Sequence, residues 1–326
     1  MADGPELGEA TAHGGPEARF LSEGEPFGFM ADCQVHEQRH ATQDCRRPHM
    51  SHIFVQAETL PEAWEKAVVE CWENGARART EYDKPTDPES RDCTAMIVAT
   101  HPLREPRLHR AFPGGLEELE VYRQEVVHGI HDHWIDPASG KWSYTYHQRL
   151  FAYDVFDDKG QKKTIDQFAF IIEKLSQAPH SRRAQAITWK TEVDTVVDDP
   201  ACLQRLWFRI FQDELHCNCH MRSNDAFKAA FMNMWAFTDL QRFVAEEVSK
   251  RTGRAIRPGP YTHIVDSFHI YGSYFADFRA FLETLQKRTF AERVWDSTSE
   301  LVQSSFAYAR EQIAKESKQK IGVPLS

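Results

Sequence analysis

Apolar positions along the chain follow two different periods, and each period predicts one type of secondary structure. Repeats of three and four residues predict helices over 61–74, 115–128, 164–175 and 225–250, and a nearly continuous helical pattern over 275–318. Alternation or short apolar runs predict strands over 52–56, 94–100, 184–191, 203–211, 215–222 and 260–268, with 142–156 as a strand that leads into a helix. These patterns indicate an α+β fold, with one large mixed sheet flanked by helices and a helical C-terminal segment.

The first fifty residues differ from the rest of the chain in composition. Residues 1–28 are rich in Gly, Pro, Glu and Ala and show little periodicity, which is typical of a flexible extension. Regular patterning begins near His52. We therefore expect a partly flexible N-terminal extension over 1–50 and one folded domain over 51–326.

Composition and charge narrow the class of protein. The 326 residues are 41% hydrophobic, which is enough for a large core, and the net charge of −10 disfavours nucleic acid as a partner. The seven scattered cysteines are odd in number and do not resemble a disulfide framework. The N-terminus lacks the pattern of a signal peptide, and no apolar run approaches the roughly 18 residues of a membrane span. We expect a cytoplasmic protein.

A thiol and several arginines form the first group of candidate site residues. Cys202 follows a Pro-containing turn at the start of a predicted strand, and as a nucleophile it needs nearby cations to lower its pKa. Arg182 and Arg183 precede it by about 20 residues, and Arg222 follows it by about 20. Their guanidinium groups and the Ser223 hydroxyl suit a phosphate. The alternative is a buried, inert thiol and solvated arginines.

Polar residues in apolar surroundings form the second group. On the predicted helix, Asp225 and Asn233 are roughly 80° apart around the axis and about 12 Å apart along it. A buried Asn233 amide must be paired, either with the backbone or with a ligand such as a pyrimidine edge. His269 and Tyr271 point to the same face of a predicted strand and suit a sugar hydroxyl, unless they are simply half-buried polar rings.

In their order and spacing, these residues resemble the thymidylate synthase family. The segments that carry the resemblance are 130–134, Tyr146 with Gln148, 165–167, 181–183, Pro200 with Cys202, Arg222, Ser223 and Asp225, Asn233, and His269 with Tyr271. The match covers roughly residues 115–275, and the joint pattern is far more specific than any single piece. The first hundred residues look more like the divergent archaeal branch of the family.

The resemblance implies transfer of a one-carbon unit from 5,10-methylenetetrahydrofolate to C5 of a pyrimidine nucleoside monophosphate. Cys202 would add to C6 of the ring and so make C5 nucleophilic. Asn233 would orient the base. Tyr146 and a glutamate would support the proton transfers, with Glu120 as the first choice for that glutamate and Glu118 as the second.

The resemblance also assigns binding roles. The implied phosphate ligands are Arg222 and Ser223, Arg182 and Arg183 from the second subunit of a homodimer, and Arg79 as a mobile arginine. His269 and Tyr271 would hold the ribose 3′-hydroxyl, and Asp225 would contact the pterin of the folate.

Two departures from the family pattern bear on the product, and one residue bears on the base. His131 stands where the family has a tryptophan beside the folate, and a smaller polar ring there would admit water and give a 5-hydroxymethyl product. The C-terminal pattern shows no evident folate-covering tail, which also favours water entry. Asn233 favours uracil, because cytosine-specific relatives tend to carry Asp there. Methylation of a uracil nucleotide is the expected reaction, and hydroxymethylation of dUMP, UMP, dCMP or CMP is the alternative.

Metal binding and a non-catalytic role are the competing interpretations. Two groups contain zinc-ligand residue types: Cys33, His36, His40, Cys45, His49 and His52, and then His216, Cys217, Cys219 and His220. The first fits no strong finger pattern, and strand alternation splits the second, so no metal is expected. A nucleotide-binding regulator on the same fold would keep the arginines but would have no need for the Cys202 thiol.

Overall fold

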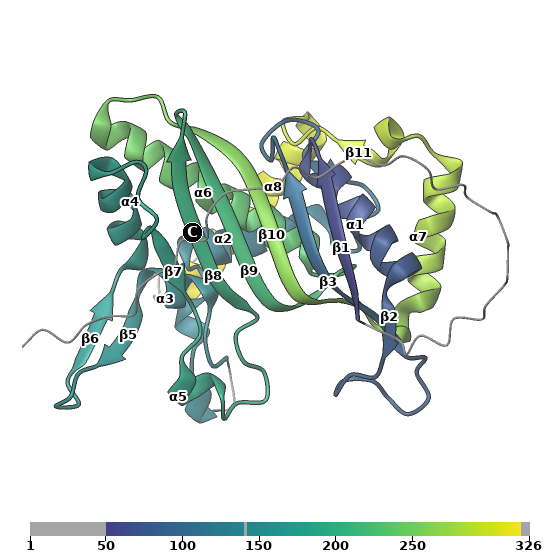
Figure 1. Ribbon diagram of the computed structural model, residues 1–326, viewed down its shortest axis with the longest axis horizontal. Coiled ribbons are helices and arrows are strands. Elements are labelled where there is room, and N and C mark those ends of the chain that lie inside the picture. Colours follow the sequence, from purple (N-terminus) through teal and green to yellow (C-terminus); the bar gives the residue numbers. More distant parts are fainter. Residues whose placement is uncertain (1–49, 140–141, 321–326) are drawn as a thin grey trace, which may run out of the picture. The chain divides into compact units, whose positions relative to one another are not determined.

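The computed structural model describes residues 50–139 and 142–320, and the account below concerns these residues (Figure 1). The predicted extension over 1–50 lies outside them, apart from its last residue. So does most of the first His/Cys group, of which only His52 is described.

A seven-stranded mixed sheet organises the described part of the chain (Figure 1). Its main path runs in the order β1 (Ser51–Ala57), β3 (Ser90–Ala99), β10 (Arg257–Ile270), β9 (Glu214–Asp225), β8 (Leu203–Phe211) and β7 (Gln185–Ile187). Strand β2 (Ala76–Ala78) pairs with the start of β3. The β1–β3 and β9–β10 pairs are parallel and the other pairs are antiparallel. This sheet confirms the predicted α+β class.

Two small ribbons and several helices complete the fold. The ribbons pair β4 (Leu108–His109) with β11 (Val294–Trp295), and β5 (Tyr153–Phe156) with β6 (Lys162–Ile165). The helices are α1 (Leu60–Asn74), α2 (Leu116–His128), α3 (Tyr146–Phe151), α4 (Gln167–Gln177), α5 (Thr191–Asp194), α6 (Ala230–Thr252), α7 (Phe275–Lys287) and α8 (Glu300–Lys320). No helix in the described ranges is long and apolar enough to cross a membrane.

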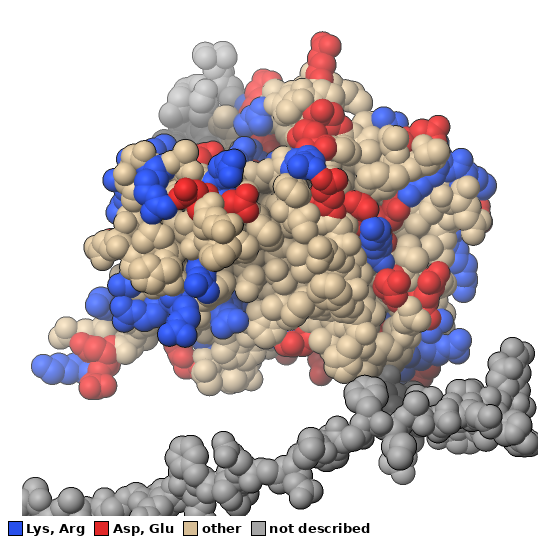
Figure 2. Space-filling model, turned by 45° about the horizontal axis from the view of Figure 1, so that its top comes forward, with Lys and Arg blue, Asp and Glu red and all other residues tan. Residues whose placement is uncertain are grey.

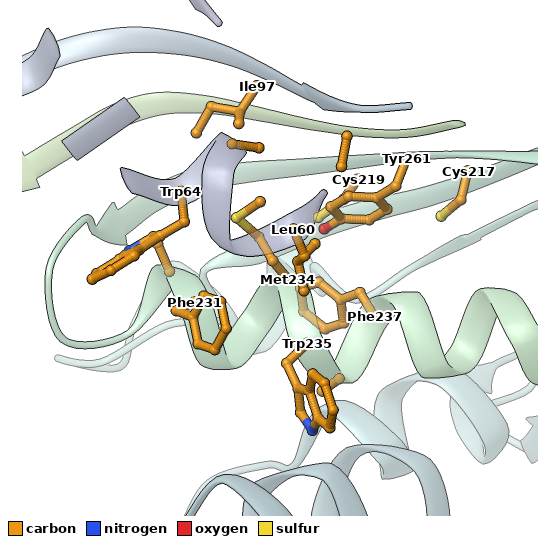
Figure 3. Close-up of a cluster of buried hydrophobic side chains, with 14 of the residues drawn as sticks. Leu60, Trp64, Ile97, Cys217, Cys219, Phe231, Met234, Trp235, Phe237 and Tyr261 are labelled. Atoms are coloured by element: carbon orange, nitrogen blue, oxygen red, sulfur yellow. The ribbon is translucent and has the colours of Figure 1, made fainter. Parts of the chain in front are cut away.

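The core lies between one face of the sheet and helices α1 and α6 (Figure 3). Trp64 of α1 is fully buried, and its indole N–H donates a hydrogen bond of 2.9 Å to the carbonyl of Ala226, just after β9. Tyr261 and Cys219 come from the neighbouring strands β10 and β9 and are also fully buried. The end of β9, which carries several candidate site residues, is therefore held firmly against the core.

The opposite face of the sheet is uncovered by the described chain and carries large apolar side chains. One row across the strands contains Phe54, Met96 and Ile264, of which Phe54 is 64% exposed and Met96 is 41% exposed. Figure 2 shows a broad area of uncharged side chains on one side of the molecule, with charged residues gathered around its margins. A contiguous apolar surface of this kind is typical of a protein–protein interface.

Two of the predicted boundaries that were wrong lie close to the candidate site residues. The segment 142–156 forms helix α3 before strand β5, because the Thr145 hydroxyl caps the helix by accepting a bond from the Gln148 N–H at 3.0 Å. The long helix begins at Ala230 rather than at Asp225, which is the last residue of β9. The Asp225 carboxylate accepts hydrogen bonds from the backbone N–H groups of Phe227 and Lys228. These bonds form a turn, and the helix begins only after it. Asp225 and Asn233 therefore do not share a helix.

Candidate active site

One cavity of about 500 Å³ gathers most of the predicted site residues. Those that line it are Cys202, Tyr146, Asn233, Asp225, Arg222, Ser223, His269 and Tyr271. They come from segments more than a hundred residues apart in the chain, namely α3, the start of β8, the ends of β9 and β10, and the first turn of α6. Convergence of a thiol, an arginine and an amide in one concave site is the arrangement expected of an active site.

Arg222 holds the turn that presents Cys202. Its guanidinium donates hydrogen bonds to the carbonyls of Ala201, at 3.1 Å, and Pro200, at 2.6 Å. The backbone N–H of Arg222 donates to the Cys202 carbonyl at 2.9 Å. Arg222 therefore positions the backbone on which the Cys202 thiol is carried, and it also lines the cavity.

A buried ion pair anchors the same turn from the other side. Arg149 of α3 contacts both carboxylate oxygens of Asp194, at 2.8 and 3.2 Å, and both side chains are almost fully buried. Asp194 also accepts bonds from the backbone N–H groups of Lys190 and Ala201. Because Ala201 directly precedes Cys202, this pair couples α3 to the position of the thiol.

Burial sets the protonation state of Cys202. It raises the pKa of the thiol, Arg222 opposes that rise, and Asp199 adds to it. Arg222 is the one arginine that lines the cavity among the described residues. To be a thiolate, Cys202 would therefore need a second cation in addition to the residues that line the cavity.

Tyr146 contacts the strand that follows the thiol. Its hydroxyl accepts a hydrogen bond from the backbone N–H of Leu203 at 3.2 Å. Burial raises the pKa of Tyr146 well above its ordinary value, so the phenol stays protonated. The hydroxyl can thus donate a proton or relay one, but it does not act as a preformed phenolate.

The Asn233 amide is held by a tyrosine that the sequence patterns did not single out. The Tyr122 hydroxyl, on α2, donates to the Asn233 Oδ1. Burial raises the pKa of Tyr122, which keeps the phenol a donor. Nδ2 of Asn233 is consequently directed away from Tyr122, and no described residue accepts a bond from it.

The pair His269 and Tyr271 lies at the end of β10 with ring centroids 4.5 Å apart. His269 is 4% exposed, and its Nε2 atom has no hydrogen-bond partner among the described residues. Nδ1 of His269 lies 3.2 Å from the Ser267 carbonyl, which identifies Nδ1 as a donor and makes Nε2 the nitrogen that can accept a bond in the tautomer this fixes. A ligand hydroxyl would satisfy this unpaired atom.

The two glutamates predicted for proton transfer do not reach this cavity. Glu120 is fully buried, and its carboxylate accepts bonds from Arg123, Gln124 and Arg310 at 2.5–3.0 Å. Burial alone would raise the pKa of Glu120, but these bonds more than offset it and the pKa is lowered. Glu118 accepts a bond from the Gly115 N–H at the start of α2. Glu120 instead ties α2 to α8.

Glu125, five residues after Glu120 on the same helix, does reach a cavity. It lines a second cavity, of about 480 Å³, which shares Tyr122, Tyr146 and Asp199 with the first. Burial raises the pKa of Glu125, and a hydrogen bond with His131 only partly opposes this rise. A sequence signal existed, because Tyr122 and Glu125 are three residues apart on α2 and so share a helix face.

His131 does not line either cavity directly but supports the second one. Its Nδ1 lies 3.1 Å from the Glu125 carboxylate, and its ring stacks on Trp134 with centroids 3.6 Å apart. The ring also meets the edge of Trp142, which lines the second cavity. The residue that was expected to contact the folate therefore contacts the Glu125 carboxylate.

Three predicted phosphate arginines lie outside the cavity lining. Arg79 donates to the carbonyls of Lys84 and Asp87 in the loop after β2. Arg182 and Arg183 are exposed beside the edge strand β7, where the Arg182 carbonyl accepts a bond from the Trp207 indole at 3.0 Å. The cavity lining within this chain thus includes Arg222 and Ser223 but not these three arginines.

The second His/Cys group is split as predicted. Cys217 and Cys219 are fully buried on the core face of β9, whereas His216 and His220 are partly exposed on the open face.

Comparison with known proteins identifies the family. The family model for thymidylate synthase matches residues 114–319. A Methanocaldococcus jannaschii protein, provisionally named a thymidylate synthase, is 31% identical over 224 residues, which cover 67% of this chain and 90% of that protein. The chain therefore belongs to the thymidylate synthase family, which confirms the resemblance seen in its motifs.

A further sequence relative and a solved structure are also similar to this chain. The thymidylate synthase of Haloferax volcanii is 27% identical over 193 residues, which cover 53% of each chain. The structure of the thermostable thymidylate synthase A from Bacillus subtilis superposes with a TM-score of 0.53 at 15% identity, over 69% of this chain and 84% of that one. At that identity the structural match supports the fold alone.

Proposed function

We propose that this chain transfers a one-carbon unit from 5,10-methylenetetrahydrofolate to C5 of a uracil nucleoside monophosphate, through a covalent bond between Cys202 and C6 of the ring. The observation that carries the proposal is the presence of the Cys202 thiol in one cavity with the Asn233 amide and the Arg222 guanidinium. A binding protein would have no use for a thiol held in place by two sets of hydrogen bonds.

Cys202 would act as the nucleophile once deprotonated. Its sulfur would form a bond to C6, and the displaced electron pair would move through C5 toward the carbonyl oxygen at C4. This charge makes C5 nucleophilic, so that C5 would bond to the one-carbon unit. Loss of the C5 proton would then expel the folate nitrogen from that carbon and leave a methylene group on the ring, and addition of hydride or water to this methylene would release the thiolate. Arg222 opposes the rise in the pKa of the thiol that burial causes, and a bound phosphate would compete for this cation.

Tyr146 and Glu125 are the groups suited to move protons. The Tyr146 phenol, held by the Leu203 N–H, can relay the C5 proton through its hydroxyl. Glu125, whose pKa burial raises, can hold a proton closer to neutral pH than an exposed carboxyl and can donate it toward the carbonyl oxygen at C4. We therefore assign to Glu125 the role expected of Glu120, whose carboxylate is occupied by two arginines.

Asn233 would select the base. Because Tyr122 donates to its oxygen, the amide offers Nδ2 as a donor, which matches the carbonyl oxygen at C4 of uracil. Cytosine carries an amino group at that position, and two donors would face each other. An unpaired donor in a buried site costs binding energy, so uracil is preferred.

The rest of the cavity would hold the sugar and the phosphate. His269 presents an unpaired acceptor, and Tyr271 stands beside it, so the pair suits a ribose hydroxyl. Arg222 and Ser223 would bind the phosphate.

The residues that line the second cavity suit a folate. Tyr122, Trp142 and Tyr144 line it and offer the flat apolar surfaces that a pterin ring needs. Asp225, which lines the adjoining cavity, would contact the pterin. Methylenetetrahydrofolate would supply the one-carbon unit and, for a methyl product, the hydride. Glu125 and the aromatic walls would position the ring and limit the access of water.

Hydroxymethylation is a second candidate, favoured by the pairing of His131 with Glu125. His131, which the family resemblance aligns with an apolar indole, is a polar imidazole hydrogen-bonded to Glu125. A carboxylate–imidazole pair can orient a water molecule, and addition of water in place of hydride would give a hydroxymethyl group.

A homodimer would complete the site. The open sheet face, with Phe54, Met96 and Ile264, is the surface we assign to the second subunit. Arg182 and Arg183 lie beside β7 at the edge of this sheet, from which they could reach the partner's cavity. They would supply the second cation that Cys202 lacks within one protomer.

Product analysis tests the reaction. The purified protein would be incubated with methylenetetrahydrofolate and, separately, dUMP, UMP, dCMP and CMP, and the products read by mass spectrometry with Cys202→Ala as the control. A gain of CH₂ on a uracil nucleotide is expected, and a gain of CH₂O would establish hydroxymethylation instead. Nucleotide binding without any product would replace the enzyme by a nucleotide-binding regulator.

A further inference from the structure

Asn224 is a cavity residue that neither the sequence patterns nor the proposed mechanism uses. It lies on β9 between Ser223 and Asp225, is 3% exposed, and lines the cavity that contains Cys202. Its side chain lies on the core side of the sheet, where it contacts the fully buried His263 of β10. An amide there must be paired, because a buried polar group without a partner is costly.

A chain of hydrogen bonds through the core fixes this amide. The Asn224 Oδ1 lies 2.9 Å from Nε2 of His263, and a carbonyl oxygen can only accept, so His263 is the donor. The Tyr261 hydroxyl lies 2.8 Å from the other ring nitrogen, Nδ1. Since burial lowers the pKa of His263 to about 3, the ring is neutral, and Nδ1 must accept from Tyr261.

The far end of this chain is also held. Tyr261 and His263 are fully buried, and Figure 3 shows the Tyr261 hydroxyl directed toward the sulfur of Cys219, with which it is hydrogen-bonded. Burial keeps the thiol and the phenol protonated. Cys219, Tyr261 and His263 are therefore all neutral at physiological pH. The direction of each hydrogen bond that links them to Asn224 is set.

The other end of the Asn224 amide faces the cavity. No described residue accepts a bond from its Nδ2, yet this atom is not among the buried unpaired ones, so it reaches the cavity space. The cavity thus contains two amides whose oxygens are occupied, Asn224 by His263 and Asn233 by Tyr122. Both present N–H donors to whatever binds there.

We propose that Asn224 is a second base-reading residue, whose Nδ2 donates to the carbonyl oxygen at C2 of the pyrimidine ring, and that His263 and Tyr261 are positioning residues for it. The inference rests on the proposed function, because it takes the bound nucleotide as its ligand. A phosphate would be bound by the guanidinium of Arg222 and a sugar hydroxyl by His269, which leaves the neutral donor of Asn224 for a ring carbonyl. Uracil has two such carbonyl groups, matching the two fixed amides.

A substrate analogue tests the contact without any mutation. Binding of the preferred uracil nucleotide and of its 2-thio analogue, whose sulfur is a weaker acceptor, would be measured by calorimetry with no folate present. We expect the unaltered protein to bind the 2-thio nucleotide about tenfold more weakly, as for the loss of one buried hydrogen bond. Equal affinities would overturn the proposal. Because this readout is binding, it is independent of turnover, which tests the proposed reaction separately.

Variants assign the contact to Asn224. In Asn224→Ala the nucleotide should bind about tenfold more weakly, and the 2-thio analogue should bind no worse than the nucleotide. Asn74→Ala, at an exposed asparagine bonded to Glu70, should behave like the unaltered protein. Persistence of the analogue's penalty in Asn224→Ala would show that another group binds the carbonyl and would overturn the assignment.

The positioning role has its own readout. His263→Gln keeps a side-chain N–H donor and should retain most of the penalty for the 2-thio analogue, whereas His263→Phe leaves the amide unheld and should lose most of it. A merely structural role would lower the melting temperature in both without changing the ratio of the two affinities, and that result would remove His263 from the proposal. The comparison uses variants that retain the unaltered protein's far-ultraviolet circular dichroism.

Discussion

The Tyr122 hydroxyl on α2 donates a hydrogen bond to the side-chain oxygen of Asn233 on α6, and this bond decides which end of the amide faces the nucleotide. In Tyr122→Phe the oxygen loses its donor and the amide can turn over. We expect the preference for uracil over cytosine nucleotides, measured as a ratio of kcat/KM values, to fall about tenfold. Tyr308→Phe removes a hydroxyl that is exposed on α8 and is the matched control. An unchanged ratio in Tyr122→Phe would contradict this role.

Glu125 and Glu120 lie on the same helix, and replacement of each by glutamine should have a different effect. Glu125→Gln removes the carboxyl that lines the second cavity, so turnover should fall by about a hundredfold or more while nucleotide affinity is kept. Glu120→Gln weakens the bonds to Arg123 and Arg310, so the melting temperature should fall while the folded enzyme keeps its activity. Single-turnover kinetics and thermal unfolding on both variants distinguish the two, and the reverse pattern would restore the role to Glu120.

The ring at position 131 should control the ratio of the two products. His131→Trp removes the hydrogen bond to Glu125 and fills the space beside Trp134 with an apolar indole. Water should be excluded more completely, so methyl product should increase at the expense of hydroxymethyl product. Mass spectrometry of the nucleotide gives the ratio directly. A ratio that does not move in this variant would show that water access is set elsewhere.

Much of this site could be predicted from one sequence because its residues lie on regular elements. The predicted strand over 203–211 coincides with β8, so the position of Cys202 just before a strand was predictable. The predicted strand over 260–268 lies within β10 and ends next to His269. The motifs at the strand ends then met in one cavity because adjacent strands bring their ends together.

The parts that could not be predicted depend on side chains that choose between partners. Asp225 ended a strand by bonding two backbone N–H groups, which no apolar period reveals. Helix α2 places Glu120 and Glu125 on different faces, and the choice between them required its packing against α8. The tautomer of His263 follows from Tyr261 and Asn224, and the latter lies 39 residues away in the chain.

The buried pair between Arg149 and Asp194 should matter for stability as well as for the thiol. Asp194→Asn would leave Arg149 as an uncompensated buried cation, and we expect a loss of about 3–5 kcal/mol in the free energy of unfolding. Asp213→Asn breaks an exposed pair with Arg254 and should change stability by less than about 1 kcal/mol. Denaturant unfolding measures both, and similar losses in the two variants would show that the buried pair is no stronger than a surface one.

His263 should give the protein part of its sensitivity to acid. Burial lowers the pKa of His263 from an ordinary value of 6.5 to about 3, so below pH 6.5 the unfolded chain binds a proton that the folded chain does not. The stabilising effect is complete above pH 6.5 and is lost as the pH falls toward 3. At about 1.4 kcal/mol per pH unit, the full effect is about 4–5 kcal/mol.

Replacement of the histidine isolates this effect from the carboxylates, which also titrate in acid. His263→Gln has no proton to gain, so its free energy of unfolding should fall less steeply between pH 6.5 and 4 than that of the unaltered protein. His101 lies exposed on the surface and is the matched control, so His101→Gln should follow the unaltered curve. Urea unfolding at several pH values provides the curves. If the His263→Gln curve ran parallel to the unaltered one, His263 would have to be protonated in the fold, and the direction of its bond to Asn224 would need to be assigned anew.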